Sequence, residues 1–473
     1  MKKTNLSVAI ALLATSPLTL ADDETFYGWS QSASVALTSD YVWRGVSQTN
    51  NDPAIQGSFD LAHESGFYIG AWASNVEFAD GGKTSLELDA YAGFSRETDF
   101  GGLLPTALTY DVGFLHYEFP ATSDYNINEV YFGAAISPVD NLNFSTYYYL
   151  DIGVENKIGK GYVDISADYT LPDWAWGATL IAHAGQYDRT AGADDYWDWK
   201  LGIAKDIAGF NFEVAYLDTD GAGGVDGNLS DGRVVVTVSK SLGDDLSGEM
   251  LPDGFSSSAS AALTTDYMWR GISQTNNDPA IQGSFDLAHE SGAYIGVWGS
   301  NVEFLGGSSD TVSLELDAYA GFSRATDFGG LLPTAITYDI GFLHYEFPSS
   351  SSSNINEVYF GAAISPVENL NISTYYYLDA GIENTTANGY IDFSTDYTLP
   401  DWAWNTTILA HAGHYDRQDG ADDYWDWKAG VAKDIGHFNF EVAYHDTDGA
   451  GIGGLSQGNV QDGRVVGTVS SSF

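Results

Sequence analysis

Apolar and polar residues alternate with a period of two along most of the chain, and helical periodicity is almost absent. The run that begins at Trp29 shows the pattern. Its apolar face comprises Trp29, Ala33, Val35, Leu37, Tyr41 and Trp43. Its polar face comprises Ser30, Ser32, Ser34, Thr38, Asp40 and Arg44. Alternation of this kind predicts β-strands whose two faces meet different surroundings.

Twelve such runs can be counted in the first half of the chain. They begin near Trp29, Ala54, Phe67, Leu86, Thr106, Ile127, Leu142, Tyr162, Gly177, Tyr196, Gly209 and Gly232. Short connectors such as HESG (63–66) alternate with longer polar ones such as DTDGAGGVDGNLSDG (218–232). An even number of strands, with short turns facing longer loops, is typical of an all-β, antiparallel, up-and-down transmembrane barrel.

A soluble β-sandwich is the alternative, and the position of the charges argues against it. Leu88 and Ala90 alternate with Glu87 and Asp89 in the centre of one run. Carboxylates in strand centres cannot face lipid, so we expect them to line the inside of a barrel, where water or partners satisfy them.

The first run also serves as a measure of length. The steps from Trp29 to Trp43, at about 3.3 Å each and a tilt of roughly 45°, cross about 33 Å, which matches a bilayer. We therefore expect Tyr41 and Trp43 at the lipid rim, Arg44 turned into the barrel mouth, and residues 45–53 as the first external loop.

The chain contains one unit written twice. Residues 44–66 and 270–292 differ only at Val46 and Ile272, and the match continues to the ends of both units. The expected organisation is a signal peptide (1–21), barrel unit one (22–242), a linker (243–257) and barrel unit two (258–473). Two 12-stranded barrels compete with one 24-stranded barrel. The long acidic linker with Pro252, and closing strands that end alike (VVVTVSKSL and VVGTVSSSF), favour two.

The segment SDYVWRGVSQTNNDPAIQGSFD, followed by GFYIGAWASNV and ELDAYAGFS, resembles the proteobacterial porin-like proteins of the TorF type, an outer-membrane domain family of unknown function. The resemblance covers each unit nearly end to end. It implies an outer-membrane barrel with a porin role and no established substrate. The family pattern is expected once per chain, so the tandem duplication departs from it.

The N-terminus and the composition indicate where the protein is located and which partners it can have. Lys2 and Lys3, an apolar stretch over 6–20 and then Ala21 are typical of a secretory signal peptide, which predicts export to a Gram-negative outer membrane. Expected partners are therefore outer-membrane lipid and the barrel-assembly machinery. The chain has 18 Lys and Arg against 65 Asp and Glu, a net charge of −47, which excludes nucleic-acid binding. There are no cysteines and no motif that indicates a cofactor.

The alternation assigns a set of charged residues to the lumen. In unit one the pore-lining candidates are Asp40, Arg44, Asp60, Glu87, Asp89, Asp111, Glu129, Asp151, Asp164, Asp168, Asp198, Lys200 and Glu213. In unit two they are Asp266, Arg270, Asp286, Glu315, Asp317, Asp339, Glu357, Asp379, Asp392, Asp396, Asp426, Lys428 and Glu441. Only Arg44 and Lys200, with their counterparts, are expected to oppose the acids.

An acidic, water-filled lumen predicts passive diffusion of small hydrophilic solutes with a weak preference for cations. The alternative is a lumen filled by side chains in a polar network, which would make the protein a closed scaffold or a surface binding protein. A row of tyrosines is also expected to face inward. They could form a stacking surface along which sugars or nucleosides move, or they could simply fill the interior. They are Tyr68, Tyr91, Tyr117, Tyr131, Tyr147, Tyr149 and Tyr162. Arg44 either narrows the mouth or binds an anionic group of a solute, or it forms a structural ion pair with an interior acid, and the ion pair is favoured.

Three further sequence patterns give little support for a binding or catalytic site. The loops that begin at Asp218 and Asp446 match a calcium-binding loop poorly and are expected to be solvated. The HESG turn is not expected to set His63 against Ser65 as a catalytic pair, so no enzyme is predicted. His411 and His414 project to opposite strand faces, which argues against a metal site.

Overall fold

The computed structural model of the chain describes residues 27–78, 84–102, 104, 106–153, 159–189, 194–222, 228–243, 251–305, 311–329, 334–380, 387–417, 422–449 and 459–473. The predicted signal peptide (1–21) and residues 244–250 of the predicted linker lie outside these ranges. The fold divides into two compact units, the first ending near Met250 and the second beginning near Leu251. Each unit is described by itself.

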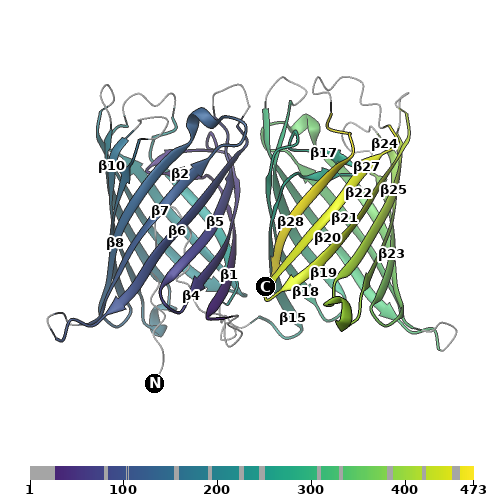
Figure 1. The fold of residues 1–473 in the computed structure, drawn as a ribbon, viewed down its shortest axis with the longest axis horizontal. Coiled ribbons are helices and arrows are strands. Elements are labelled where there is room, and N and C mark those ends of the chain that lie inside the picture. Colours follow the sequence, from purple (N-terminus) through teal and green to yellow (C-terminus); the bar gives the residue numbers. More distant parts are fainter. Residues whose placement is uncertain are drawn as a thin grey trace. The chain divides into compact units, whose positions relative to one another are not determined.

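In the described part of unit one, twelve strands form a closed barrel (Figure 1). They are β1 (Trp29–Thr38), β4 (Ala54–His63), β5 (Phe67–Asn75), β6 (Leu86–Thr98), β7 (Leu108–Glu118), β8 (Ile127–Val139), β9 (Leu142–Asp151), β10 (Gly159–Thr170), β11 (Thr179–Arg189), β12 (Tyr196–Ile207), β13 (Phe210–Thr219) and β14 (Arg233–Ser241). Each strand pairs antiparallel with the next, and β1 closes the barrel against β14, with Ser34 opposite Ser241. Two 3-10 turns, η1 (Ser123–Tyr125) and η2 (Asp173–Ala175), lie in connections.

The described part of unit two repeats this barrel. Its strands are β15 (Phe255–Thr264), β18 (Ala280–His289), β19 (Ala293–Leu305), β20 (Thr311–Thr326), β21 (Ile336–Glu346), β22 (Ile355–Val367), β23 (Leu370–Asp379), β24 (Ala387–Thr398), β25 (Thr407–Arg417), β26 (Tyr424–Ile435), β27 (Phe438–Thr447) and β28 (Arg464–Ser472), with 3-10 turns η3 (Ser351–Ser353) and η4 (Asp401–Ala403). β15 closes against β28, with Ser260 opposite Ser472. The prediction of two 12-stranded barrels is confirmed, and the single 24-stranded barrel was wrong. β15 begins at Phe255, within the range expected for the linker.

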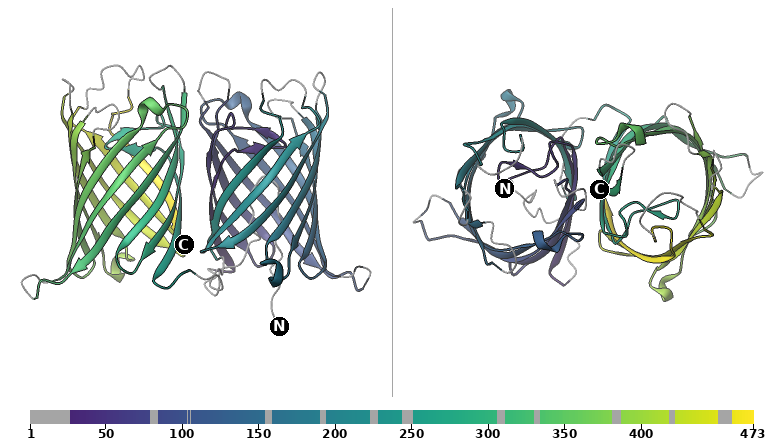
Figure 2. Two further views of the ribbon diagram at one scale, coloured as in Figure 1. Left: turned by 180° about the vertical axis from the view of Figure 1, so that it is seen from behind. Right: turned by 90° about the horizontal axis from the view of Figure 1, so that it is seen from above.

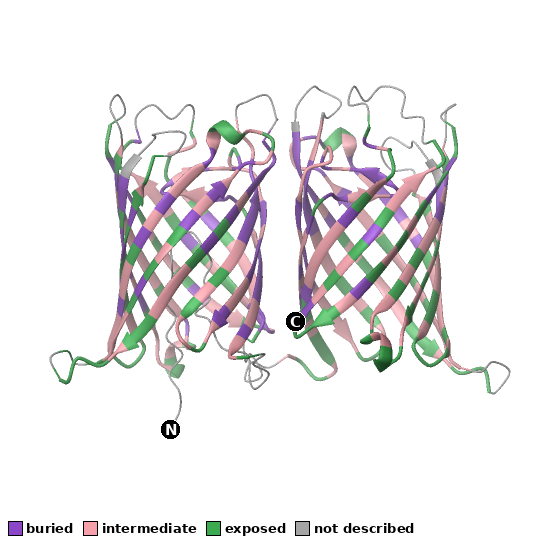
Figure 3. Ribbon diagram, viewed as in Figure 1, coloured by how far each residue is buried: buried purple, intermediate pink, exposed green. Residues whose placement is uncertain are grey.

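The two faces of the strands differ as the alternation predicts. On β10, Val163, Ile165 and Tyr169 are exposed on the outside, whereas Asp164 and Ser166 are buried on the inside. Figure 3 shows the resulting bands of exposed and buried residues along the strands. Among the described residues, no helix is long and apolar enough to cross a membrane.

Inside the wall, tyrosine side chains pack over glycines of the neighbouring strand. A Cβ atom added to Gly133 on β8 would lie 2.0 Å from a ring carbon of Tyr147 on β9, and one added to Gly113 would lie 2.3 Å from Tyr131. Glycine at these positions therefore leaves the space that the large ring of the next strand fills. The arrangement supports the interpretation of the tyrosines as interior packing.

The expected course of the first strand was wrong at its outer end. β1 ends at Thr38, and the following residues fold back into the barrel as a hairpin of β2 (Val42–Trp43) and β3 (Val46–Ser47). The same hairpin, β16 (Met268–Trp269) with β17 (Ile272–Ser273), occurs in unit two. Figure 2 shows each hairpin inside its ring of strands. Tyr41 and Trp43 therefore face the barrel interior and not the lipid. Aromatic rings on the inner wall give them a packing surface there, as lipid would at the rim.

Candidate functional site

We call residues 40–53 of unit one, and residues 266–279 of unit two, the inward hairpin. The candidate site is the part of each lumen that holds this hairpin. Its turn is made by Arg44 and Gly45, whose φ angles of 48° and 78° lie in the left-handed region. A Cβ atom on Gly45 would lie 2.5 Å from the Thr219 side chain, so glycine permits both the turn and the close approach to the wall. The Tyr196 hydroxyl donates to the Arg44 carbonyl at 2.8 Å and holds the turn in place.

Arg44 forms an ion pair with Glu129 of β8. Its Nη2 donates to both carboxylate oxygens, at 2.8 and 2.7 Å, and the two side chains are 0% and 2% exposed. Tyr117 donates a further hydrogen bond to Glu129 at 3.0 Å. Arg270 and Glu357 repeat the pair in unit two at 2.8 Å. The structural ion pair expected for Arg44 is therefore present, and it joins the hairpin to the wall.

Aromatic rings surround the same guanidinium. The Arg44 Cζ lies 4.3 Å from the ring centre of Trp43, 4.5 Å from that of Tyr162 and 4.8 Å from that of Tyr187. The Trp43 ring in turn meets Tyr117 and Tyr187 edge to face. Cation–π contacts of this kind stabilise a desolvated guanidinium that one carboxylate alone would leave partly unsatisfied.

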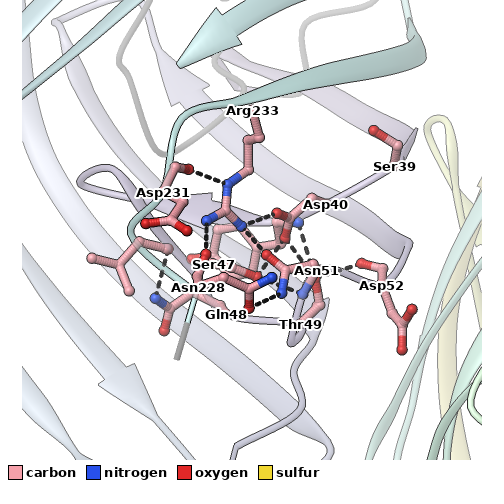
Figure 4. A network of polar contacts seen from close by, with 12 residues as sticks. Ser39, Asp40, Ser47, Gln48, Thr49, Asn51, Asp52, Asn228, Asp231 and Arg233 are labelled. Carbon is pink, nitrogen blue, oxygen red and sulfur yellow. Dashed lines mark hydrogen bonds and ion pairs between the residues drawn. The ribbon is translucent and has the colours of Figure 1, made fainter. Parts of the chain in front are cut away.

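A second set of contacts fixes the base of the hairpin (Figure 4). Asp40 accepts hydrogen bonds from Ser47 at 2.6 Å and from Thr49 at 3.0 Å, and its other oxygen binds Arg233 of β14 at 2.7 Å. Arg233 also bonds to Asn51. In unit two, Asp266 makes the same contacts with Ser273, Thr275 and Arg464.

The hairpin carries one further acid, Asp52, with Asp278 as its counterpart. Burial raises the pKa of the Asp52 carboxyl, and the nearby charge of Asp40 raises it further. Burial and Asp266 raise the pKa of Asp278 in the same way.

A histidine lies between two acids elsewhere in the lumen. The Nδ1 of His183 is 3.1 Å from Asp164, and its Nε2 is 2.8 Å from Asp198. His411 makes both contacts at 2.8 Å in unit two, with Asp392 and Asp426. A histidine whose two ring nitrogens both contact carboxylates is fixed in place, which suits a structural role better than that of a catalytic base.

The predicted lumen residues do not converge on one site but form separate groups. Glu87 and Glu129 meet the inward hairpin through Tyr41 and Arg44. Asp60 bonds to Tyr91, and Asp111 accepts from Tyr68 at 2.8 Å. Lys200 pairs with Glu213 at 3.0 Å. The counterparts in unit two that form the same contacts are Glu315, Glu357, Asp286, Asp339, Lys428 and Glu441.

The remaining predicted residues stand apart from these groups. Asp151 accepts the Gly153 amide at 2.7 Å at the end of β9, and Asp379 ends β23 in the same register. Asp168 lies inward on β10 beside Lys200, whereas its counterpart Asp396 accepts from Asn371 at 2.8 Å. In Asp89 and Asp317, the Oδ1 atom has no hydrogen-bond partner among the described residues, and both acids are considered below.

Two further basic residues of each lumen were missed from the sequence. Arg233 and His183, with Arg464 and His411, oppose the acids in addition to the predicted Arg44 and Lys200. Both occupy inward positions of their strands, so the alternation that assigned the acids could also have found them. Their partners could not have been found, because Arg233 and Asp40 are far apart in the sequence.

The remaining sequence motifs, namely the loops after Asp218 and Asp446, the HESG turn and the two histidines of unit two, make contacts with nearby residues. Asp218 accepts from Thr219, and Asp220 accepts from Trp197 at 2.8 Å; residues 223–227 of this loop and 450–458 of its counterpart lie outside the described residues. His63 Nδ1 lies 2.7 Å from the Ser65 hydroxyl, so the turn does bring the pair together, contrary to expectation. His411 faces the lumen acids, whereas His414 packs on the Trp425 ring.

Three solved structures illustrate the similarity to known barrels. The "KdgM porin" is 12% identical, with 45% of this chain and 99% of that chain covered and a TM-score of 0.31. The outer membrane protein opdK from Pseudomonas aeruginosa is 10% identical, with 94% and 99% covered and a TM-score of 0.31. A mutant of the Rh. blastica porin is 13% identical, with 71% and 92% covered and a TM-score of 0.27.

The comparison with curated proteins gave no match. A family model matches the chain twice, over residues 23–242 and 251–473, and its description is "Bacterial protein of unknown function (Gcw_chp)". The two matches cover both barrels nearly end to end. The chain therefore belongs to the Gcw_chp family and carries two copies of its domain.

Proposed function

We propose that each unit is an outer-membrane channel through which small hydrophilic solutes diffuse passively, with a weak preference for cations. The outer face supports insertion into a membrane. Apolar side chains around both barrels are about half exposed, among them Phe132, Ile165, Leu201, Phe360 and Val442. A folded water-soluble protein would bury such a band, whereas a bilayer covers it.

Aromatic residues at the two ends of the strands agree with this placement. Trp197 and Tyr216 are exposed near the loop end of β12 and β13, and Tyr169 and Phe212 are exposed near the opposite end of β10 and β13. Aromatic girdles of this kind mark the two interfaces of a membrane barrel.

The observation that carries the cation preference is the excess of acids on the inner face. In each lumen the acids named above outnumber the bases, even after Arg233 and His183 are added. Carboxylates that are not neutralised make the potential of a narrow lumen negative and raise the local concentration of cations. The inward hairpin would form the constriction, since it crosses the lumen and is attached to the wall.

The finer assignment to the TorF type rests on the motif DYVWRGVSQTNNDP and its recurrence. Passage through the barrel-assembly machinery and removal of the signal peptide are part of the same proposal. We further propose that the protein has no enzymatic activity, because His63 and Ser65 have no acid hydrogen-bonded to the histidine among the described residues.

The experiment that tests the channel is swelling of proteoliposomes that contain the purified full chain. Swelling in small neutral sugars such as arabinose, falling off with sugar size, is the expected result. Liposomes that do not swell in any solute, although the protein is folded in them, would reject a diffusion channel.

A closed barrel that serves as a scaffold or surface binding protein is the second candidate. The observation that favours it is the occupation of the lumen by the inward hairpin and by tyrosines that bond to Asp60 and Asp111. The swelling experiment separates the two functions directly, because a closed barrel admits no sugar.

A further inference from the structure

Within the described residues, one aspartate oxygen is buried without a hydrogen-bond partner at the same position of both lumens. Asp89 points inward from β6 and is 2% exposed, and Asp317 points inward from β20 and is 8% exposed. The Oδ1 atom of each is buried and has no hydrogen-bond partner within the described residues. Buried polar atoms are almost always satisfied, so an unpartnered oxygen that recurs in both barrels indicates a group that binds it.

Aromatic side chains frame this carboxylate. Asp89 stands directly opposite Trp72 on β5 and opposite Tyr117 on β7. Tyr41 of the inward hairpin meets Trp72 edge to face at 5.4 Å. In unit two, Asp317 stands opposite Trp298 and Tyr345, and the Tyr267 and Trp298 rings are also 5.4 Å apart.

The neighbouring charges leave the carboxylate uncompensated. Glu87, two residues away on the same strand face, accepts the Tyr41 hydroxyl at 3.0 Å. Glu129 takes the guanidinium of Arg44. Among the described residues, these three carboxylates thus meet one cation, and an unpaired buried carboxylate is strongly unfavourable unless a counter-charge reaches it.

We propose that Asp89 and Asp317 each bind a small monovalent cation of the ammonium type as it passes the inward hairpin. The free carboxylate oxygen accepts an N–H of the ion, and the surrounding rings offer the π faces that attract ammonium ions. This inference rests on the proposed channel and names the residue that selects among its ions.

A divalent metal fits these residues less well. Calcium and magnesium require about six or more oxygen ligands. Among the described residues, no group of three or more His, Cys, Asp or Glu is arranged to hold a metal ion. One free oxygen and several ring faces suit a monovalent ion that keeps part of its water.

The first test is ion selectivity of the full chain in planar bilayers with NH4Cl on one side and LiCl on the other. Lithium is the comparison because its hydration shell is held tightly. The variant is Asp89→Asn combined with Asp317→Asn, which keeps shape and removes charge. We expect the ammonium-to-lithium permeability ratio to fall about fivefold, as for the loss of roughly 1 kcal/mol of cation binding.

The matched control is Asp60→Asn combined with Asp286→Asn. It removes the same number of lumen charges, but from acids that accept tyrosine hydrogen bonds. The control should change the ratio much less. Equal effects of the two double variants would show a general field and would overturn a site at Asp89 and Asp317.

A second readout does not depend on conduction. Binding to the folded state should raise the melting temperature of the detergent-solubilised chain in NH4Cl relative to N-methylglucamine chloride at equal ionic strength, and the Asp89→Asn, Asp317→Asn chain should lose this rise. A wild-type chain that shows the rise but conducts nothing would reject the channel and keep the site. A wild-type chain that conducts while both readouts ignore the substitution would reject the site and keep the channel. If the double variant does not fold, Asp317→Asn alone should lose half of the effect.

Discussion

Arg44 and Glu129 join the inward hairpin to the barrel wall through two hydrogen bonds of 2.8 and 2.7 Å from one guanidinium nitrogen, with both side chains almost fully buried. Arg270 and Glu357 reproduce the contact. Because Glu129 lies on β8, several strands away from β1 around the barrel, the pair connects the hairpin to a distant part of the wall. It is one of the contacts that hold the hairpin, the proposed constriction, against the wall.

Breaking this pair on one side should release the hairpin. Glu129→Gln with Glu357→Gln leaves a buried guanidinium without its counter-charge, which typically costs about 3–5 kcal/mol of stability. We expect unfolding at a lower urea concentration and a larger, less steady single-channel conductance. Lys200→Met with Lys428→Met, which breaks a partly exposed pair, is the control and should have a smaller effect on both. Equal effects of the two variants would contradict the anchoring role.

The base of the hairpin should be protected by Arg233. Arg233→Gln with Arg464→Gln removes charged hydrogen bonds to Asp40 and Asp266, each worth about 1.5–3 kcal/mol. The hairpin should then open more often, so trypsin should cut faster after Arg44 and Arg270, as measured by mass spectrometry of the fragments. Arg96→Gln with Arg324→Gln, at exposed positions of β6 and β20, should leave this cleavage rate unchanged. A rate unaffected by Arg233→Gln would mean that Arg44 alone holds the hairpin.

The raised pKa of Asp52 and Asp278 predicts a pH-dependent stability. A carboxyl whose pKa is raised in the folded state disfavours folding while it is ionised, and this effect disappears as the pH falls through the raised pKa. Asp52→Asn with Asp278→Asn should therefore melt slightly higher than the wild type at neutral pH and equally below about pH 3.5. Asp124→Asn, in an exposed part of another loop, is the control. A difference that persists in acid would show that charge is not its cause.

The glycines beneath the tyrosine rings should not tolerate a methyl group. In Gly133→Ala with Gly361→Ala, the new Cβ would lie 2.0 and 2.2 Å from the rings of Tyr147 and Tyr375. Overpacking of this kind typically costs about 1–3 kcal/mol, so unfolding should occur at lower urea. Gly467→Ala is the control, because its Cβ would meet only Thr265 at 3.8 Å and unit one has Val236 at this position. Equal stability of the two variants would contradict the packing described for the wall.

The sequence was sufficient for the barrels because their determinants are local. Each strand can be predicted from its own alternation of apolar and polar residues, as for Val163 to Tyr169. The recurrence of the unit with its own closing strand indicates two barrels. Neither inference requires knowledge of which strands meet.

The inward hairpin could not be predicted for a physical reason. Tyr41 and Trp43 continue the alternation of β1, and a protein interior accepts aromatic rings as well as a lipid rim does, so the pattern cannot tell one from the other. The partners that distinguish them, Glu87 and Tyr117, lie on other strands. The residue identities in the lumen could thus be predicted, but their pairing required the fold.

The most direct test of an acidic channel is the reversal potential of the full chain in a planar bilayer across a KCl gradient. The excess of carboxylates in each lumen predicts a reversal potential whose sign shows that potassium is more permeable than chloride. The reversal potential should shrink when Glu87→Gln and Glu315→Gln remove acids beside the hairpin. A reversal potential of the sign set by chloride would contradict the account, as would the absence of conductance from folded, inserted protein.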